Sequence, residues 1–197
     1  MHGSLYDAAF VAHDHGADGA RLCCRTWRSS QAAAHATAPV LLFRQGSGER
    51  GDDNRAQTRV GLGPALLRDP PPWPLLAVFP QLPAGARWSG SHADDAIAIL
   101  DDASMRVGGD RARVALTGPL RGGYDVLELA LRWPRRFRAL VPVRGGITAP
   151  PHDAALQAAA APVHYRELPE AQHNVRDAAY TDPALWRWLV RTLDEET

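Results

Sequence analysis

Short apolar runs alternate with longer amphipathic stretches through the central part of this chain. Three of these runs, Val40 to Phe43, Leu75 to Phe79 and Arg113 to Leu116, are each followed by turn residues and then by a stretch with helix-like character. Ala139 to Val143 forms a further run. This alternation is typical of βαβ units, so it predicts an α/β fold with a largely parallel sheet. The expected helices span Asn54 to Leu67, His92 to Arg106, Gly122 to Trp133, Asp153 to Ala160 and Pro183 to Asp194.

The N-terminal part of the chain has a different pattern. Tyr6 to His13 and Arg21 to Trp27 flank the turn-forming segment His15 to Gly19, which predicts an antiparallel hairpin at the start of the sheet. Ser29 to Ala38 is a connector of small residues, and the prolines of Asp69 to Pro74 predict a stiff, extended linker. With no internal repeat, the 197 residues are expected to form a single domain.

Composition narrows the classes of partner. The chain has 22 basic and 22 acidic residues, so its balance favours neither nucleic acid nor an anionic membrane. The basic residues are all arginine, which is typical of a GC-rich, bacterial-like coding bias. A cytoplasmic protein is expected, because we find neither a membrane span nor a basic, apolar leader.

The cysteines and histidines do not predict a metal centre. Cys23 and Cys24 are adjacent, which suits neither an ordinary disulfide nor a C-x-x-C metal site. His92, His152 and His164 lack a tight metal-ligand spacing. We therefore expect no metal and no other cofactor.

One segment carries a specific pattern. Val114 to Gly123 reads as a strand, a glycine-containing turn and the start of a helix. In a nucleophile elbow, G-x-S-x-G places a serine hydroxyl above the sheet, where helix amides face the developing oxyanion. Here Gly118 and Gly122 keep the turn, but Leu120 occupies the nucleophile position. The plainer alternative is an ordinary strand-to-helix turn whose glycines permit close packing.

Four stretches in the same order resemble the serine carboxylesterases related to polyhydroxybutyrate depolymerases and feruloyl esterases, within the α/β-hydrolase superfamily. The first follows the pattern of an apolar strand and then H-G-x-G-E-R-G-D-D-N. The matching stretches are Val40 to Asn54, Val78 to Trp88, Asp110 to Tyr124, and Leu168 to Val175 continuing to Tyr180 to Pro183. The resemblance implies a three-layer α/β-hydrolase-like sandwich with a mostly parallel, twisted sheet and an N-terminal antiparallel hairpin, shortened near the C-terminus.

The chain departs from this family at the chemical positions. Leu120 replaces the nucleophile, and the His-Gly of the oxyanion-type loop reads Gln45-Gly46, although amides near Gly46 and Ser47 remain as donors. The segment that carries the triad aspartate has no counterpart after Val163. By resemblance, His173 stands where the general base is expected, as a relic or as a working base.

Other residues of the chain are candidates for the missing groups. Asp153, Asp177 and Asp182 are candidate acids, although Asp182 followed by Pro183 more simply caps the last helix. Ser47, Ser89 and Ser91 are candidate nucleophiles. The favoured roles are a turn residue for Ser47 and a helix cap for Ser89 or Ser91.

Several side chains are expected at the crevice above the sheet. Arg121 lies beside Leu120, and Arg144 ends a central strand, so both are expected near Arg44 and His173. Ligands favour this edge of open α/β sheets, and arginine binds carboxylate or phosphate through paired donors. Trp88 is expected to line the same crevice. The alternative is that each arginine forms a salt bridge or faces water.

Two functions compete at this point. The favoured one is a catalytically inactive hydrolase-fold protein that binds a small molecule, such as an ester or a carboxylate, or a partner chain through the former active-site crevice. The alternative is a carboxylesterase with His173 as general base and a non-standard nucleophile or an activated water. A homo-oligomer, or an assembly role beside an active relative, is a variant of the first.

Overall fold

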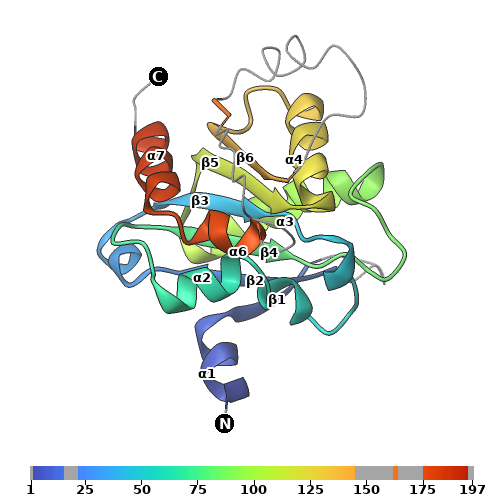
Figure 1. Ribbon diagram of the computed structural model, residues 1–197, viewed down its shortest axis with the longest axis horizontal. Helices are drawn as coiled ribbons and strands as arrows, with labels where there is room; N and C mark the ends of the chain where they lie inside the picture. Colours follow the sequence, from blue (N-terminus) through green and yellow to red (C-terminus); the bar gives the residue numbers. More distant parts are fainter. Residues whose placement is uncertain (1, 16–21, 145–161, 164–174, 195–197) are drawn as a thin grey trace.

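The computed structural model describes residues 2–15, 22–144, 162–163 and 175–194. One six-stranded sheet with the strand order β1-β2-β4-β3-β5-β6 forms the centre of the molecule, with helices on both faces (Figure 1). The strands are β1 Val11–His15, β2 Leu22–Arg28, β3 Ala38–Phe43, β4 Leu76–Pro80, β5 Gly109–Pro119 and β6 Ala139–Val143. The α-helices are α1 His2–Ala9, α2 Leu62–Arg68, α3 Ser91–Val107, α4 Arg121–Arg132, α6 Val175–Tyr180 and α7 Pro183–Asp194.

The central strands of the sheet are parallel. β3 pairs in parallel with β4 and β5, and β5 pairs in parallel with β6. β1 and β2 form the antiparallel hairpin, and β2 is antiparallel to β4. The prediction of a mostly parallel α/β sheet with an N-terminal antiparallel hairpin is confirmed.

The alternation of side chains along β3 separates two apolar cores. Leu41 and Phe43 point into a cluster with residues of α2, α6 and α7, whereas Val40 and Leu42 point into a cluster with residues of α3 and α4. All six residues of β3 are buried. Because both faces of the sheet are covered, its central strands read as continuous apolar runs rather than as alternating ones.

Two predicted elements were wrong at the N-terminal side. Residues 6–9 belong to the helix α1, not to the first strand, which begins at Val11. The i, i+4 spacing of Tyr6 and Phe10 stacks their rings at a centroid distance of 5.0 Å, with Phe10 fully buried. The expected helix Asn54 to Leu67 is also broken: a 3-10 turn, Ala56–Thr58, precedes α2. Gly61, with a φ of 60°, separates the two.

None of the described helices is long and apolar enough to cross a membrane.

The end of β3 and the start of α4 approach each other unusually closely. A Cβ atom at Gly122 would lie 2.1 Å from the carbonyl oxygen of Arg44, and one at Gly118 would lie 2.5 Å from the same oxygen. The backbone N–H of Arg44 donates to the carbonyl of Thr117 at 2.7 Å. Glycine is therefore required on both sides of the turn between β5 and α4.

We predict that Gly122→Ala lowers the free energy of unfolding by more than about 3 kcal/mol, since the new methyl group must displace backbone rather than a side chain. Denaturant unfolding followed by circular dichroism measures the change. Gly48→Ala is the matched control, because a Cβ there meets no atom within 4 Å. A loss at Gly122 no larger than at Gly48 would contradict the close approach.

Candidate functional site

Leu120 joins β5 to α4 in a strained backbone conformation. Its φ is 55° and its ψ is −117°, a region that residues with a side chain rarely adopt and that costs about 1–3 kcal/mol. The backbone N–H of Leu120 donates to the carbonyl of Val143 at 2.8 Å, and its own carbonyl accepts from the N–H of Gly123 at 3.0 Å. The turn thus has the sharp backbone of a nucleophile elbow, while a half-exposed hydrocarbon occupies the reactive position.

Arg44 and Gln45 follow β3 and are both buried, at 0% and 1% exposure. The guanidinium carbon of Arg44 lies 4.0 Å from the centroid of the Trp88 ring, a cation–π contact. None of the three guanidinium nitrogens has a hydrogen-bond partner among the described residues, and neither polar atom of the Gln45 amide has one. Burial lowers the pKa of Arg44 to about 9, against the opposing charges of Asp125 and Glu128.

Asp125 lies on α4, one turn after Arg121, and is 2% exposed. Its Oδ1 is 3.5 Å from Nε of Arg121, which is an ion-pair distance but not a hydrogen bond. Burial raises the pKa of Asp125 to about 6, opposed by the charges of Arg44 and Arg121. This carboxyl group is therefore poised to change charge near neutral pH.

A small hollow lies between the loop that follows β3 and the start of α4. Gln45, Trp88, Arg121 and Asp125 line about 180 Å³ of empty space that leaves no room for a water-sized sphere. Nε1 of Trp88 is also buried without a partner within the described part of the chain. Buried polar atoms are nearly always paired in folded proteins, so this concentration of unpaired ones marks a site rather than ordinary core.

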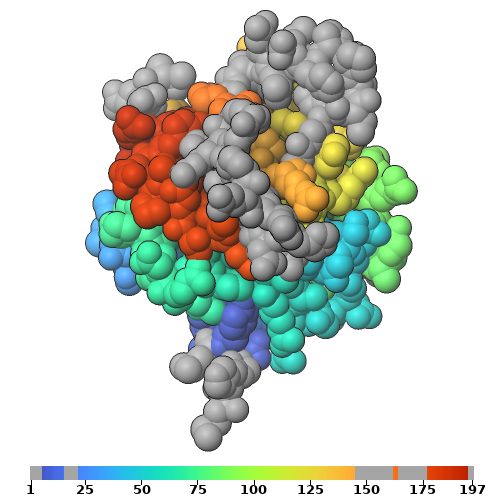
Figure 2. Space-filling view, in the orientation of Figure 1, coloured from blue at the N-terminus to red at the C-terminus, as the bar shows by residue number. Residues whose placement is uncertain are grey.

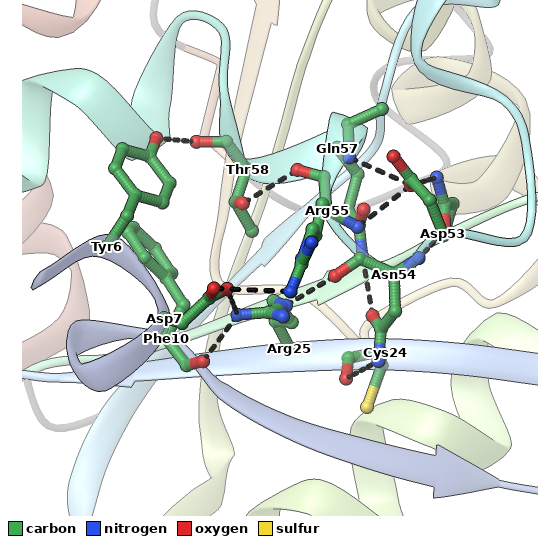
Figure 3. A network of polar contacts seen from close by, with 12 residues as sticks. Tyr6, Asp7, Phe10, Cys24, Arg25, Asp53, Asn54, Arg55, Gln57 and Thr58 are labelled. Atoms are coloured by element: carbon green, nitrogen blue, oxygen red, sulfur yellow. Dashed lines mark hydrogen bonds and ion pairs between the residues drawn. The ribbon is translucent and has the colours of Figure 1, made fainter. Parts of the chain in front are cut away.

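Asp53 and Asn54, in the loop after β3, form a network of hydrogen bonds, part of which Figure 3 shows. The side-chain oxygen of Gln81 accepts from the backbone N–H of Asn54 at 2.6 Å, while the Gln81 amide donates to Asp53 at 2.7 Å. Asn54 also donates to the carbonyl of Cys24 at 3.2 Å, and Arg25 donates to the carbonyl of Asn54. Asp53 and Asn54 therefore hold the loop after β3 against β2 and the end of β4.

The structure places the other predicted site residues apart from this hollow. Ser47 is exposed and accepts from Arg50 at 2.9 Å, and Arg144 is exposed after β6. The prediction that Ser89 or Ser91 caps a helix was wrong, because α3 begins at Ser91 after Gly90 without a side-chain cap.

The structure describes only some of the residues that were predicted to form the site. Gly46 and the buried Trp88 line the hollow, whereas Arg44 does not line it and lies fully buried against the Trp88 ring. His173 and Asp153 lie outside the described residues. Asp177 is exposed on α6, whereas the predicted cap is confirmed: Asp182 accepts from the N–H of Ala184 at 2.9 Å.

Asp125 is the residue that sequence reasoning missed. It shares a helix face with Gly122, Val126 and Leu129, all of which are buried. A carboxylate on the apolar face of an amphipathic helix is the signal that would have found it. Within the described ranges, no cluster of histidine, cysteine, aspartate or glutamate is arranged to hold a metal ion.

We predict that Leu120→Gly is more stable than Leu120→Ala by about 1 kcal/mol, because glycine alone adopts the elbow conformation without strain. Both variants remove the same side chain, so their difference in free energy of unfolding isolates the backbone. Equal stabilities would show that the turn at Leu120 is unstrained.

A second prediction concerns the pH dependence of stability. Because the folded state raises the pKa of Asp125 from 3.8 to about 6, it binds this proton more tightly than the unfolded state does. The stability of the native chain relative to Asp125→Asn should therefore fall as pH rises from 3.8 through about 6, and then level off. Urea unfolding at several pH values measures this difference.

Asp53→Asn provides the opposite control. Burial acts to raise the pKa of Asp53, but hydrogen bonds from Gln81 and from the amides of Ala56 and Arg55 outweigh it, so the pKa is lowered. The contribution of Asp53 is present above pH 3.8 and is lost as pH falls through its lowered pKa. A difference curve for Asp125→Asn that is flat between pH 3.8 and 6 would contradict its burial.

Comparison with known proteins supports the fold. The sequence matches no protein-family model and no curated protein. A thermostable esterase structure superposes with a TM-score of 0.77 at 20% identity over 95% of this chain and 64% of the esterase, so this chain spans less than two thirds of its length. FphF, a fluorophosphonate-binding serine hydrolase of Staphylococcus aureus, gives 0.53 at 14% identity, covering 93% and 74% of the two chains. An acetyl xylan esterase from Aspergillus awamori gives 0.52 at 12% identity, covering 70% and 53%. The chain therefore has the α/β-hydrolase fold of esterases and serine hydrolases.

Proposed function

We propose that this chain is a non-catalytic α/β-hydrolase-fold protein that binds a small carboxylate at the former active-site crevice. The observation that carries the proposal is Leu120, a hydrocarbon held in the strained backbone of a nucleophile elbow. A leucine side chain has no lone pair with which to attack a carbonyl. The conformation persists without the hydroxyl that would use it.

The hollow beside the start of α4 favours an anionic ligand. Trp88 and Gln45 line the hollow and supply N–H donors, and the guanidinium of Arg44 lies against the Trp88 ring. None of these donors has a protein partner among the described residues. A guanidinium binds a carboxylate through two parallel hydrogen bonds. Replacing a buried charge by a well-packed apolar residue is often neutral or stabilising, so Arg44 is better explained by a ligand than by stability.

Asp125 modulates this preference. When it is ionised, it opposes a bound carboxylate, and when it is protonated it offers a donor. Since its pKa is raised to about 6, binding is expected to strengthen as pH falls toward 5. The hollow leaves no space for a water-sized sphere, so the ligand's charged end must displace Trp88 or Arg121 as it enters.

The competing function is ester hydrolysis with His173 as general base and a hydroxyl or water as nucleophile. The glycine-bearing start of α4 favours it, because the backbone N–H of Gly122 lies in the first turn of α4 beside the elbow, where oxyanions are stabilised. A thermostable esterase also shares the fold. Both functions use the same crevice, so they differ in covalent chemistry rather than in location.

A fluorophosphonate probe separates the two functions. We expect no adduct by intact mass on the folded native chain, and no hydrolysis of p-nitrophenyl acetate above the buffer rate, because no nucleophile stands at the elbow. His173→Ala is the control. Stoichiometric labelling that is lost in this variant would overturn the proposal and would locate a replacement nucleophile by peptide mapping.

Calorimetric titration with butyrate tests the binding arm of the proposal. Arg44→Met removes the guanidinium but keeps a long side chain, and it is expected to weaken butyrate binding at least about tenfold while leaving the thermal midpoint unchanged or higher. Arg59→Met, at an exposed arginine, should change neither quantity. Butyrate binding that is equal in both variants, or absent from the native chain, would remove the carboxylate site.

A further inference from the structure

A second cleft lies on the face of the molecule that carries α7. It has a volume of about 910 Å³ and is bounded by the end of α2, the segment 69–73 and α7. Figure 2 shows α7, in red, adjoining the green segment that includes α2. The cleft shares no lining residue with the hollow beside the start of α4. The function proposed for the crevice does not involve this second cleft.

The walls of this cleft are apolar and stiff. One wall consists of Pro70, Pro71 and Pro72, whose rings fix the backbone. Trp73 and Trp186 meet edge to face at a centroid distance of 6.4 Å. Nε1 of Trp186 donates to the carbonyl of Tyr180 at 3.0 Å, which fixes that ring. The cleft is therefore formed before a ligand arrives, and little conformational entropy is lost on binding.

Three arginines give the rim a positive charge. Arg68 extends from the end of α2, and Arg187 and Arg191 lie one helical turn apart on α7. All three are exposed, and within the described part of the chain none pairs with a carboxylate. Like charges at i, i+4 on a helix destabilise the helix. Asp69 is the one acidic side chain among the described residues that line the cleft.

We propose that this cleft binds an amphipathic carboxylate, with a medium-chain acyl or aryl body between the prolines and tryptophans and its charged end at the arginines of α7. The volume lies within the roughly 300–1,000 Å³ typical of small-molecule pockets. The apolar walls provide the favourable burial, and the arginine pair provides a forked donor set that selects the anion. The site is independent of the proposed function of the crevice.

Decanoate is the probe, with decanol as its uncharged partner of equal length. Calorimetry should show one decanoate bound per chain in this cleft, with quenching or enhancement of tryptophan fluorescence from Trp73 and Trp186, and at least tenfold weaker binding of decanol. The double variant Arg187→Gln and Arg191→Gln should weaken decanoate binding at least about tenfold. Arg59→Gln, an exposed arginine away from the cleft, should have no effect.

Two further variants separate the sites. Val190→Trp fills the cleft while leaving the arginines in place, and it should also abolish decanoate binding. Arg44→Met should leave binding in the cleft intact whether or not the crevice binds butyrate. Decanoate binding that survives Val190→Trp but is lost in Arg44→Met would overturn the proposal. A dimer by light scattering that Val190→Trp dissociates, without decanoate binding, would instead assign the cleft to a second copy of the chain.

Discussion

The contact between the carbonyl of Arg44 and the glycines of the elbow fixes the relation between the two central strands and α4. With hypothetical Cβ distances of 2.1 Å at Gly122 and 2.5 Å at Gly118, no side chain fits at either of these two positions. The contact joins the end of β3 to the turn between β5 and α4. It also places the loop beginning at Arg44 directly beside the elbow. The glycine pattern is therefore a packing requirement of the fold, and it does not depend on which side chain stands between the glycines.

The same separation of packing from chemistry explains why the motif after β3 is a good guide to fold and a poor guide to activity. Asp53 and Asn54 hydrogen bond with Gln81, and Asn54 reaches the carbonyl of Cys24. These contacts attach the loop to β2 and β4 whether or not any reaction takes place above them. Gln45, the position that would contribute chemistry, takes no part in these hydrogen bonds, so they do not fix its residue type. A sequence can thus keep most of the motif and lose its reactive part.

The central sheet could be predicted because buried parallel strands, such as β3, have an unbroken apolar sequence. The hairpin was predicted, but its first strand was started too early and α1 was missed, because eight residues give too few turns to distinguish a helix from a strand by periodicity. Asn54 and Gly61, both at positive φ, interrupted a predicted helix through backbone conformations that periodicity does not register. At the site, Leu120 was identified from its place between glycines. Asp125 was not, although it is a carboxylate on the buried face of α4, because its raised pKa depends on a degree of burial that the sequence pattern does not measure.

Backbone strain and unpaired buried polar atoms occur close together at the start of α4. Leu120 adopts a backbone conformation that glycine would adopt without penalty, and Arg44 keeps a buried charge where an apolar side chain would pack. Each feature is unfavourable alone, by about 1–3 kcal/mol for the turn. Packing against the Arg44 carbonyl explains the glycines, but it requires neither the positive φ at Leu120 nor a guanidinium beside Trp88. Natural chains retain such local costs mainly where a site needs them. The coincidence of strain, unpaired donors and a carboxyl group with a raised pKa is therefore the physical basis for proposing a ligand at this site, whether or not the chain is catalytic.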